Sequence, residues 1–158
     1  MLFTKDFSAA DKQGSVPMST GVDPLARLVS AMLAEIAGTA TIDQLRGFFM
    51  AVGNRIATIY PIGPARTMER LTQHSLLIWQ YLNWGQVHYE LDDEGIDIFH
   101  RGLPITLEGD VGAIWSEVAP FILQGTYDGW FRQLGSGERL ETTILRSDGA
   151  DVELRHGV

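Results

Sequence analysis

The sequence predicts an α+β fold in the order ααα-ββ-α-ββ: N-terminal helices, then two antiparallel β-hairpins with a long kinked helix between them. Three observations predict this class. Apolar residues recur at three-and-four spacing up to about residue 82, and the period changes to two beyond Gly85. Strands and helices do not alternate in the way that a parallel sheet requires, so antiparallel hairpins are expected.

The first two helices have clear start signals. Asp23 can accept hydrogen bonds from unpaired amides at a helix start, and Pro24 has no amide to leave unpaired. Gly38 is expected to end this helix, and the second begins at Thr41, which has capping-box spacing with Gln44. The apolar stripes are Leu25, Leu28, Val29, Met32, Leu33 and Ile36 in the first helix and Ile42, Leu45, Phe48, Phe49, Val52 and Ile56 in the second.

A break at residues 60–64 separates the second helix from the third, because its two prolines lack amides and clash with a preceding helical turn. The third helix is predicted from about Thr67 to Leu82. Its apolar side chains cover more than one face, which predicts burial on two sides, by the core and by another surface such as a second subunit. These side chains are Met68, Leu71, Leu76, Leu77, Ile78, Trp79 and Leu82.

The first hairpin is predicted from alternating residues on both sides of a turn at residues 92–95. Polar residues alternate with apolar ones on each strand, so one face is expected to be buried and the other solvated. Leu103-Pro104 is expected to end the hairpin. The inward-facing residues would be Val87, Tyr89, Leu91, Ile96 and Ile98.

The fourth helical segment is predicted from about Val111 to Leu134, and Pro120 is expected to kink or divide it. The second hairpin follows within residues 140–156, around Asp148-Gly149, a dipeptide suited to a type I′ turn. This register pairs Arg146 with Asp151 across the strands. It also places four residues on one face, namely Thr143, Leu145, Val152 and Leu154.

The length of 158 residues predicts one domain, residues 23–158, preceded by a flexible arm, residues 1–22. The arm mixes polar and small residues without a period and carries two isolated phenylalanines, Phe3 and Phe7. One interpretation is a frayed terminus. The other is an arm that packs into an oligomer through these two rings.

The composition narrows the classes of partner. A net charge of −8, with only two lysines, disfavours nucleic acids and anionic membranes but is compatible with a neutral glucan or a basic protein. The absence of cysteine excludes disulfides, thiolate zinc sites and cysteine nucleophiles. Residues 1–14 lack the pattern of a secretory signal, and apolar runs fall short of the roughly 20 residues that span a bilayer. We expect a soluble protein without membrane insertion.

The residues that could perform chemistry do not form a recognised pattern. The histidines lack metal-binding spacing, and the best cluster, His88 with Glu90 and Asp97, is expected to be polar surface on the outward face of the first hairpin. Carboxylates are numerous, but no pair is marked for glycoside hydrolysis. The sequence also lacks a nucleophile elbow, a phosphate loop and a dinucleotide fingerprint. It therefore predicts no catalysis, no metal and no cofactor.

Tryptophans are the remaining sugar-related signal, because a flat ring can stack on a pyranose. Trp79, Trp115 and Trp130 lie within helical stripes and are expected to be core or interface anchors. Trp84 lies at the junction between the third helix and the first strand. It is the best candidate for a glucan contact.

Several short segments follow one another in a distinctive order and spacing. They are the segment 52–56 (VGNRI), the proline-containing break, the helix end 83–85 (NWG), the strand 87–91, the segment 98–104 (IFHRGLP) and the helix 115–130 with 125–130 (GTYDGW). Over about residues 23–134 they resemble the D subunit of bacterial cellulose synthase (cellulose synthase operon protein D).

The resemblance implies a non-catalytic accessory subunit whose dimers assemble into an octameric ring. Such a ring would order synthase complexes or nascent β-1,4-glucan chains, so that crystalline cellulose is secreted. Other cellulose synthase subunits are the implied partners, with a proline-rich partner in some operons. The arm residues Phe3, Lys5 and Phe7, together with Trp84, would contact glucan or a partner.

Other interpretations stay open at this point. Without an export signal we expect a cytoplasmic scaffold, and the periplasm is the alternative compartment. A glucan-binding channel protein is the first alternative function. The second is a small α+β sensory domain that binds heme or another hydrophobic ligand, with His74 or His100 as the heme ligand.

Overall fold

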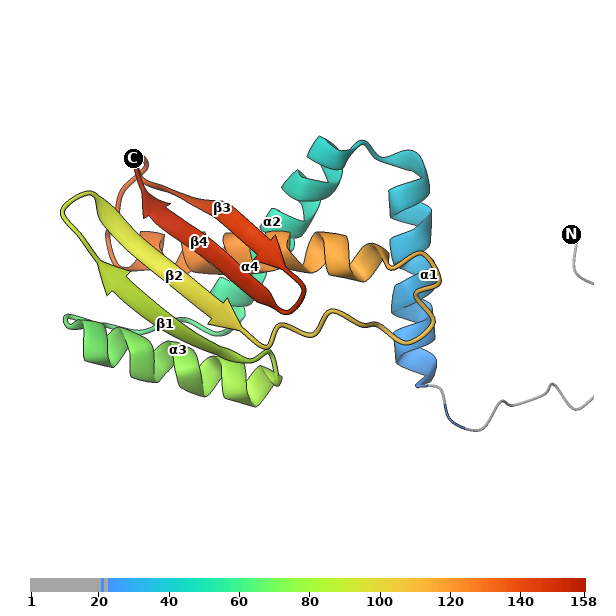
Figure 1. Ribbon diagram of the computed structural model, residues 1–158, viewed down its shortest axis with the longest axis horizontal. Coiled ribbons are helices and arrows are strands. Elements are labelled where there is room, and N and C mark those ends of the chain that lie inside the picture. The colour runs from blue at the N-terminus through green and yellow to red at the C-terminus, as the bar shows by residue number, and fades with distance from the viewer. Residues whose placement is uncertain (1–20, 22) are drawn as a thin grey trace, which may run out of the picture.

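The computed structural model of the chain describes Gly21 and residues 23–158. Over these residues it has the predicted α+β order, so the predicted fold class is confirmed (Figure 1). The elements are α1 (Pro24–Thr39), α2 (Ile42–Ile59), α3 (Met68–Leu82), β1 (Gln86–Leu91), β2 (Gly95–Arg101), α4 (Ile114–Gln133), β3 (Glu141–Asp148) and β4 (Asp151–Gly157).

The predicted starts of the first two helices are confirmed. The Asp23 carboxylate accepts a hydrogen bond from the backbone N–H of Leu25 at 3.0 Å, and Pro24 follows it. Thr41 and Gln44 form a complete capping box, in which each side chain accepts from the other residue's backbone N–H, at 3.3 and 2.8 Å. α1 continues one residue past Gly38, which was expected to end it.

The strands form one antiparallel sheet in the order β1-β2-β4-β3, so the two hairpins are joined through β2 and β4 (Figure 1). The predicted register of the first hairpin is confirmed, because Tyr89 lies opposite Ile98 and Leu91 opposite Ile96. One sheet face is buried, and the other carries charged and polar side chains. The buried side chains of the inner face include Val87, Tyr89, Ile98, His100, Val152, Leu154 and His156.

The second hairpin differs from its predicted register. Asp148 pairs with Asp151, so the turn lies one residue later than expected, and a β-bulge between Ile144 and Arg146 shifts the register again. Arg146 therefore faces Glu153 rather than Asp151, and the two side chains form an ion pair of 2.8 Å. The prediction that Thr143 and Leu145 share a face with Val152 and Leu154 was wrong. Thr143 and Leu145 are exposed, whereas Val152 and Leu154 are buried and Thr142 is the buried residue of β3.

α3 and α4 cover the inner face of the sheet, and α2 packs against α4 (Figure 1). α2 and α4 approach so closely that a Cβ atom on Gly53 would collide with the backbone at Ile122, and one on Gly125 with the backbone at Met50. Glycine is required at both positions by this backbone contact.

α4 is one continuous helix from Ile114 to Gln133, with Pro120 inside it. The alternative that Pro120 divides the helix was therefore wrong. The helix also begins three residues later than Val111, after Ala113 in a left-handed conformation. The carboxylate of Asp110 accepts from the N–H of Trp115 at 2.7 Å and satisfies one of the first amides of the helix.

The buried apolar residues form two clusters. The sheet core lies between the sheet, α3 and α4 and contains Trp79, Tyr127 and Trp130. The helix core lies between α1, α2 and the first half of α4 and contains Leu33 and Phe49 among others. Trp84 and Trp115 are half-buried and pack against both clusters, so they join the two cores.

Candidate functional site

The largest group of exposed apolar side chains on one helix lies on α1. Leu25, Leu28, Val29 and Met32 are 65%, 56%, 37% and 57% exposed, and their spacing places them on one helical face. We call these four residues the α1 face. A stripe of this kind normally packs against another element, and in the described part of the chain it does not.

The opposite side of α1 fixes the orientation of the α1 face. Leu33 packs into the helix core, and the Ser30 hydroxyl donates a hydrogen bond to the Glu108 carbonyl at 2.8 Å. The Glu108 side chain in turn accepts from the Asp23 N–H at 3.1 Å. α1 is thus held against the loop before α4, and the α1 face is turned outward.

The structure corrects the expected location of the surplus apolar surface. The third helix was expected to carry it, but in α3 Leu71 and Trp79 are buried, and Met68, Leu76, Ile78 and Leu82 are partly covered. Leu77 and Tyr81 remain exposed on α3, at 64% and 76%. The sheet and α4 supply the cover for α3, whereas no described element covers the α1 face.

Trp84, the predicted glucan contact, is half-buried between two other tryptophans. Its ring stacks on Trp79 at a centroid distance of 6.1 Å and meets the edge of Trp115 at 5.9 Å. These contacts give Trp84 a packing role between the two cores. Its contact with glucan stays a prediction.

His100 lies in the sheet core and is fully buried. Its Nε2 lies 2.7 Å from the Trp84 carbonyl and its Nδ1 lies 2.7 Å from the Tyr127 hydroxyl. A carbonyl only accepts, so Nε2 carries the hydrogen and Nδ1 accepts from Tyr127. Burial lowers the pKa of His100 to about 4 and keeps the ring neutral. Because both nitrogens are occupied, His100 does not fit the role of a heme ligand.

The other histidines also have structural partners. His74 Nδ1 lies 2.7 Å from the Ile62 carbonyl, and the exposed His88 Nε2 lies 3.4 Å from a carboxylate oxygen of Glu90. His88 and Glu90 lie on the outer face, as predicted. His156 is buried beneath Phe131, with a ring centroid distance of 4.4 Å. Among Gly21 and residues 23–158, no group of three or more possible metal ligands is present.

Asp97, the third residue of that expected polar cluster, belongs to a charge network around Arg155. The Arg155 guanidinium donates to Asp97 at 2.7 Å and to both oxygens of Asp92 at 2.8 and 2.9 Å. These bonds from Arg155 lower the pKa of Asp92 to about 2. The network ties the turn of the first hairpin to β4.

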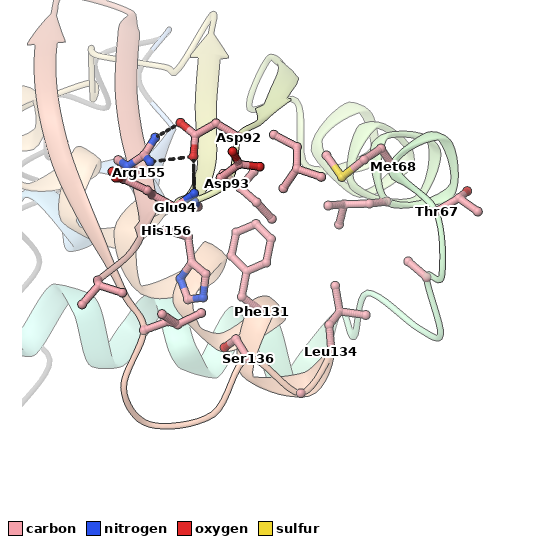
Figure 2. Close-up of a pocket in the computed structure, with 18 of the residues that line it drawn as sticks. Thr67, Met68, Asp92, Asp93, Glu94, Phe131, Leu134, Ser136, Arg155 and His156 are labelled. Atoms are coloured by element: carbon pink, nitrogen blue, oxygen red, sulfur yellow. Dashed lines mark hydrogen bonds and ion pairs between the residues drawn. The ribbon is translucent and has the colours of Figure 1, made fainter.

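A pocket of ≈ 1030 Å³ opens beside this network, and we call it the hairpin pocket. Figure 2 shows Met68 and Thr67 on one side of it, Phe131 and Leu134 on another, and the turn residues Asp92 to Glu94 at the top. Its walls come from the start of α3, the first hairpin and the end of α4. Sequence reasoning missed it, because these segments are far apart in the chain.

The remaining predicted site residues, Phe3, Lys5 and Phe7, lie outside the residues that the structure describes. Of the helices in the described part of the chain, none combines the length and apolarity needed to cross a bilayer.

Comparison with known families identifies one match. The family model for the D subunit of cellulose synthase matches residues 20–157. A comparison with curated proteins gives no match. The matched range includes α1, the sheet and the C-terminal hairpin, so it extends beyond the segments that carried the resemblance in the sequence.

Proposed function

Since the chain belongs to the cellulose synthase D-subunit family, we propose that it carries out its accessory role in cellulose synthesis as a non-catalytic, self-assembling scaffold. In this proposal dimers associate into an octameric ring. The ring arranges synthase complexes or nascent glucan chains so that the secreted cellulose is crystalline.

The α1 face is the observation that carries this proposal. Full burial of a leucine or methionine side chain contributes about 1.5–3 kcal/mol, so leaving these side chains in water forgoes several kcal/mol. Self-association is the simplest way to recover that free energy, because each copy presents the same surface. Phe48 and Ile42 of α2, 48% and 56% exposed, would extend the surface available to a partner.

The placement of the ionisable groups supports a non-catalytic role. The buried histidine His100 is fully hydrogen-bonded within the sheet core, and Asp128 accepts from Thr142 and Arg132 within the fold. Arg155 is committed to Asp92 and Asp97. These groups are engaged in hydrogen bonds and ion pairs that stabilise elements of the fold against one another.

The test is the mass of an α1-face variant in solution. Leu28→Asp combined with Met32→Asp places two charges in the proposed interface, so the assembled species should disappear from light scattering while the circular dichroism spectrum stays unchanged. Leu145→Asp is the matched control, because Leu145 is also exposed, at 60%, but lies on β3. The control should keep the wild-type mass. An unchanged mass for the α1-face variant would contradict the proposal.

The same pair of variants tests the biological role and the compartment. Cells carrying the α1-face variant should secrete cellulose of lower crystallinity by X-ray diffraction, whereas cells carrying Leu145→Asp should not. Fractionation of these cells tests the proposed cytoplasmic location against the periplasm. If the α1-face variant is monomeric and its cells still secrete cellulose of normal crystallinity, self-assembly is not needed for the function and the scaffold proposal is refuted.

A further inference from the structure

We propose that the hairpin pocket receives residues 3–7 of a second copy, with Phe3 and Phe7 in its apolar part and Lys5 at its acidic rim. The inference deepens the proposed self-assembly and rests on it, because it names a second contact between copies. It gives the arm residues singled out in the sequence a specific place to bind.

The walls of the hairpin pocket are mainly apolar. Met68 and Leu71 line it from α3, Ile96 from β2, Phe131 from α4 and Leu134 from the residue just after α4. At ≈ 1030 Å³ it can hold several large side chains rather than a few water molecules. In Figure 2, Phe131, Leu134 and Met68 surround the open space.

The rim of the pocket carries unneutralised negative charge. Asp92 is paired with Arg155, but Asp93 and Glu94, both exposed, form no side-chain hydrogen bond or ion pair with any described residue. Arg66 also lines the pocket, from the segment before α3. A cation flanked by apolar groups therefore fits the side of the pocket that carries the turn.

Two buried polar atoms at the pocket point to a peptide occupant. The Nε2 of His156, a residue only 2% exposed, and the hydroxyl of Ser136 have no hydrogen-bond partner among the described residues. Buried polar groups are normally satisfied. An extended peptide carries N–H and C=O groups along its length and can supply such partners, which a purely apolar ligand cannot.

Residues 3–7 match this pocket in pattern. In an extended chain alternate side chains share a face, so Phe3, Lys5 and Phe7 would point the same way. Two aromatic rings would then flank one of the two lysines in the chain. This order of apolar, basic and apolar groups complements apolar walls beside Asp93 and Glu94.

A second copy supplies this segment more easily than the same chain does. The arm joins the fold at α1, whereas the start of α3, the turn of the first hairpin and the end of α4, which line the hairpin pocket, lie at the opposite end of the ribbon (Figure 1). The 20 residues of α4 that separate these ends span about 30 Å. Residues 8–22, fully extended, reach at most about 50 Å. To span that distance, the chain's own arm would have to stay extended over more than half of its reach, which costs conformational entropy.

The absence of cysteine allows a direct test in the full-length chain. Phe7→Cys and Leu91→Cys are placed on separate, differently tagged chains and co-expressed, because Leu91 lines the pocket and is 65% exposed. Under an oxidising glutathione buffer, the disulfide-linked heterodimer should form at least about tenfold faster than with Leu145→Cys, since docking raises the effective concentration. Leu145, 60% exposed on β3, is the matched control.

Charge reversal tests the contact at the rim. Lys5→Glu should slow the formation of the heterodimer, and combining it with Asp93→Lys and Glu94→Lys should restore the rate. Equal rates for the Leu91→Cys and Leu145→Cys chains would overturn the proposal.

The last control distinguishes docking of the arm of a second copy from docking of the chain's own arm. If a chain with both Phe7→Cys and Leu91→Cys links within itself despite an excess of cysteine-free chain, its own arm fills the pocket and the second-copy assignment is wrong. Light scattering on the same samples separates the two proposals. An assembled protein without specific cross-linking refutes only the arm contact, whereas a monomer refutes the scaffold as well.

Discussion

The two ends of this molecule differ in how completely the chain covers its own apolar surface. In the sheet core, Trp79, Tyr127 and Trp130 are each at most 1% exposed. On the α1 face, Leu25 and Met32 are 65% and 57% exposed. Both regions are rich in large apolar residues, so composition does not explain the difference. The apolar core at the sheet end is covered by the described elements of one chain, whereas no described element covers the α1 face.

The largest effect should come from removing an aromatic ring from the sheet core. Trp79→Ala leaves a cavity among Trp84, Tyr127 and Trp130 and should lower the free energy of unfolding by about 3–5 kcal/mol. Denaturant titration measures this loss. Tyr81→Ala, on the same helix but 76% exposed, should change stability little. A similar loss for the two variants would show that the sheet end is not the better-packed region.

The contact that joins the two ends can be tested with two glycines of α2. A methyl group at Gly53 would collide with the α4 backbone, so Gly53→Ala should cost about 3 kcal/mol through forced separation of the helices. Gly47→Ala meets nothing within 4 Å and should stabilise α2 by about 0.5–1 kcal/mol. Thermal unfolding of the two variants measures both the loss of stability expected for Gly53→Ala and the gain expected for Gly47→Ala. Equal effects would contradict the close crossing of α2 and α4.

Acid should weaken the sheet end and leave the proposed apolar contact at the α1 face intact. Burial holds the pKa of His100 at about 4 against an ordinary value of 6.5. Between these pH values the unfolded chain binds a proton that the folded chain does not, so the contribution of His100 to stability falls as the pH is lowered from 6.5 to 4 and levels off below. The loss attributable to His100 is at most roughly 3 kcal/mol.

Chemical denaturation across this pH range measures the effect. His156, whose pKa burial also lowers, adds a loss in the same direction. His100→Gln should flatten the profile, although the protein starts from a lower stability. His88→Gln, at a side chain that is 69% exposed, should keep the wild-type slope. A slope unchanged by His100→Gln would show that this ring is not the group that titrates.

The smallest effect is expected on the outer face of the sheet. Arg146 and Glu153 form an exposed ion pair across the bulged hairpin, and such pairs contribute about 0.2–1 kcal/mol. Arg146→Ala should therefore lower stability by less than about 1 kcal/mol, and high salt should abolish the difference. A double-mutant cycle with Glu153→Ala measures the coupling. A coupling energy between Arg146 and Asp151 instead would contradict the observed register and support the register predicted from the sequence.

Local signals predicted well wherever a few neighbouring residues decide the structure. Asp23 and Thr41 mark helix starts, because their side chains bond to amides two or three residues away. The first hairpin was predicted correctly, because its alternation is regular and its turn is short. The second hairpin was not, since its turn lies one residue later than expected and a bulge beside Leu145 shifts the pairing again, and the sequence marks neither feature.

Features assembled from distant segments could not be predicted in this way. Periodicity shows that a stripe is apolar but not which element covers it, so the third helix was expected to carry the surplus that the structure places on α1. His100 and Tyr127 are 27 residues apart and meet only when α4 lies against the sheet. The hairpin pocket likewise joins three separate parts of the chain. The family was nevertheless predicted from the sequence, because the order and spacing of several short segments sufficed to identify it.

The most direct test of this account is the mass of the wild-type protein in solution, measured by sedimentation velocity over a range of micromolar concentrations. Copies that cover one another's α1 faces should sediment as a multiple of the 17.5 kDa chain, and dilution should shift the distribution toward smaller species. A folded, stable species of 17.5 kDa at every concentration would show that the exposed α1 face needs no second copy, and it would contradict the scaffold.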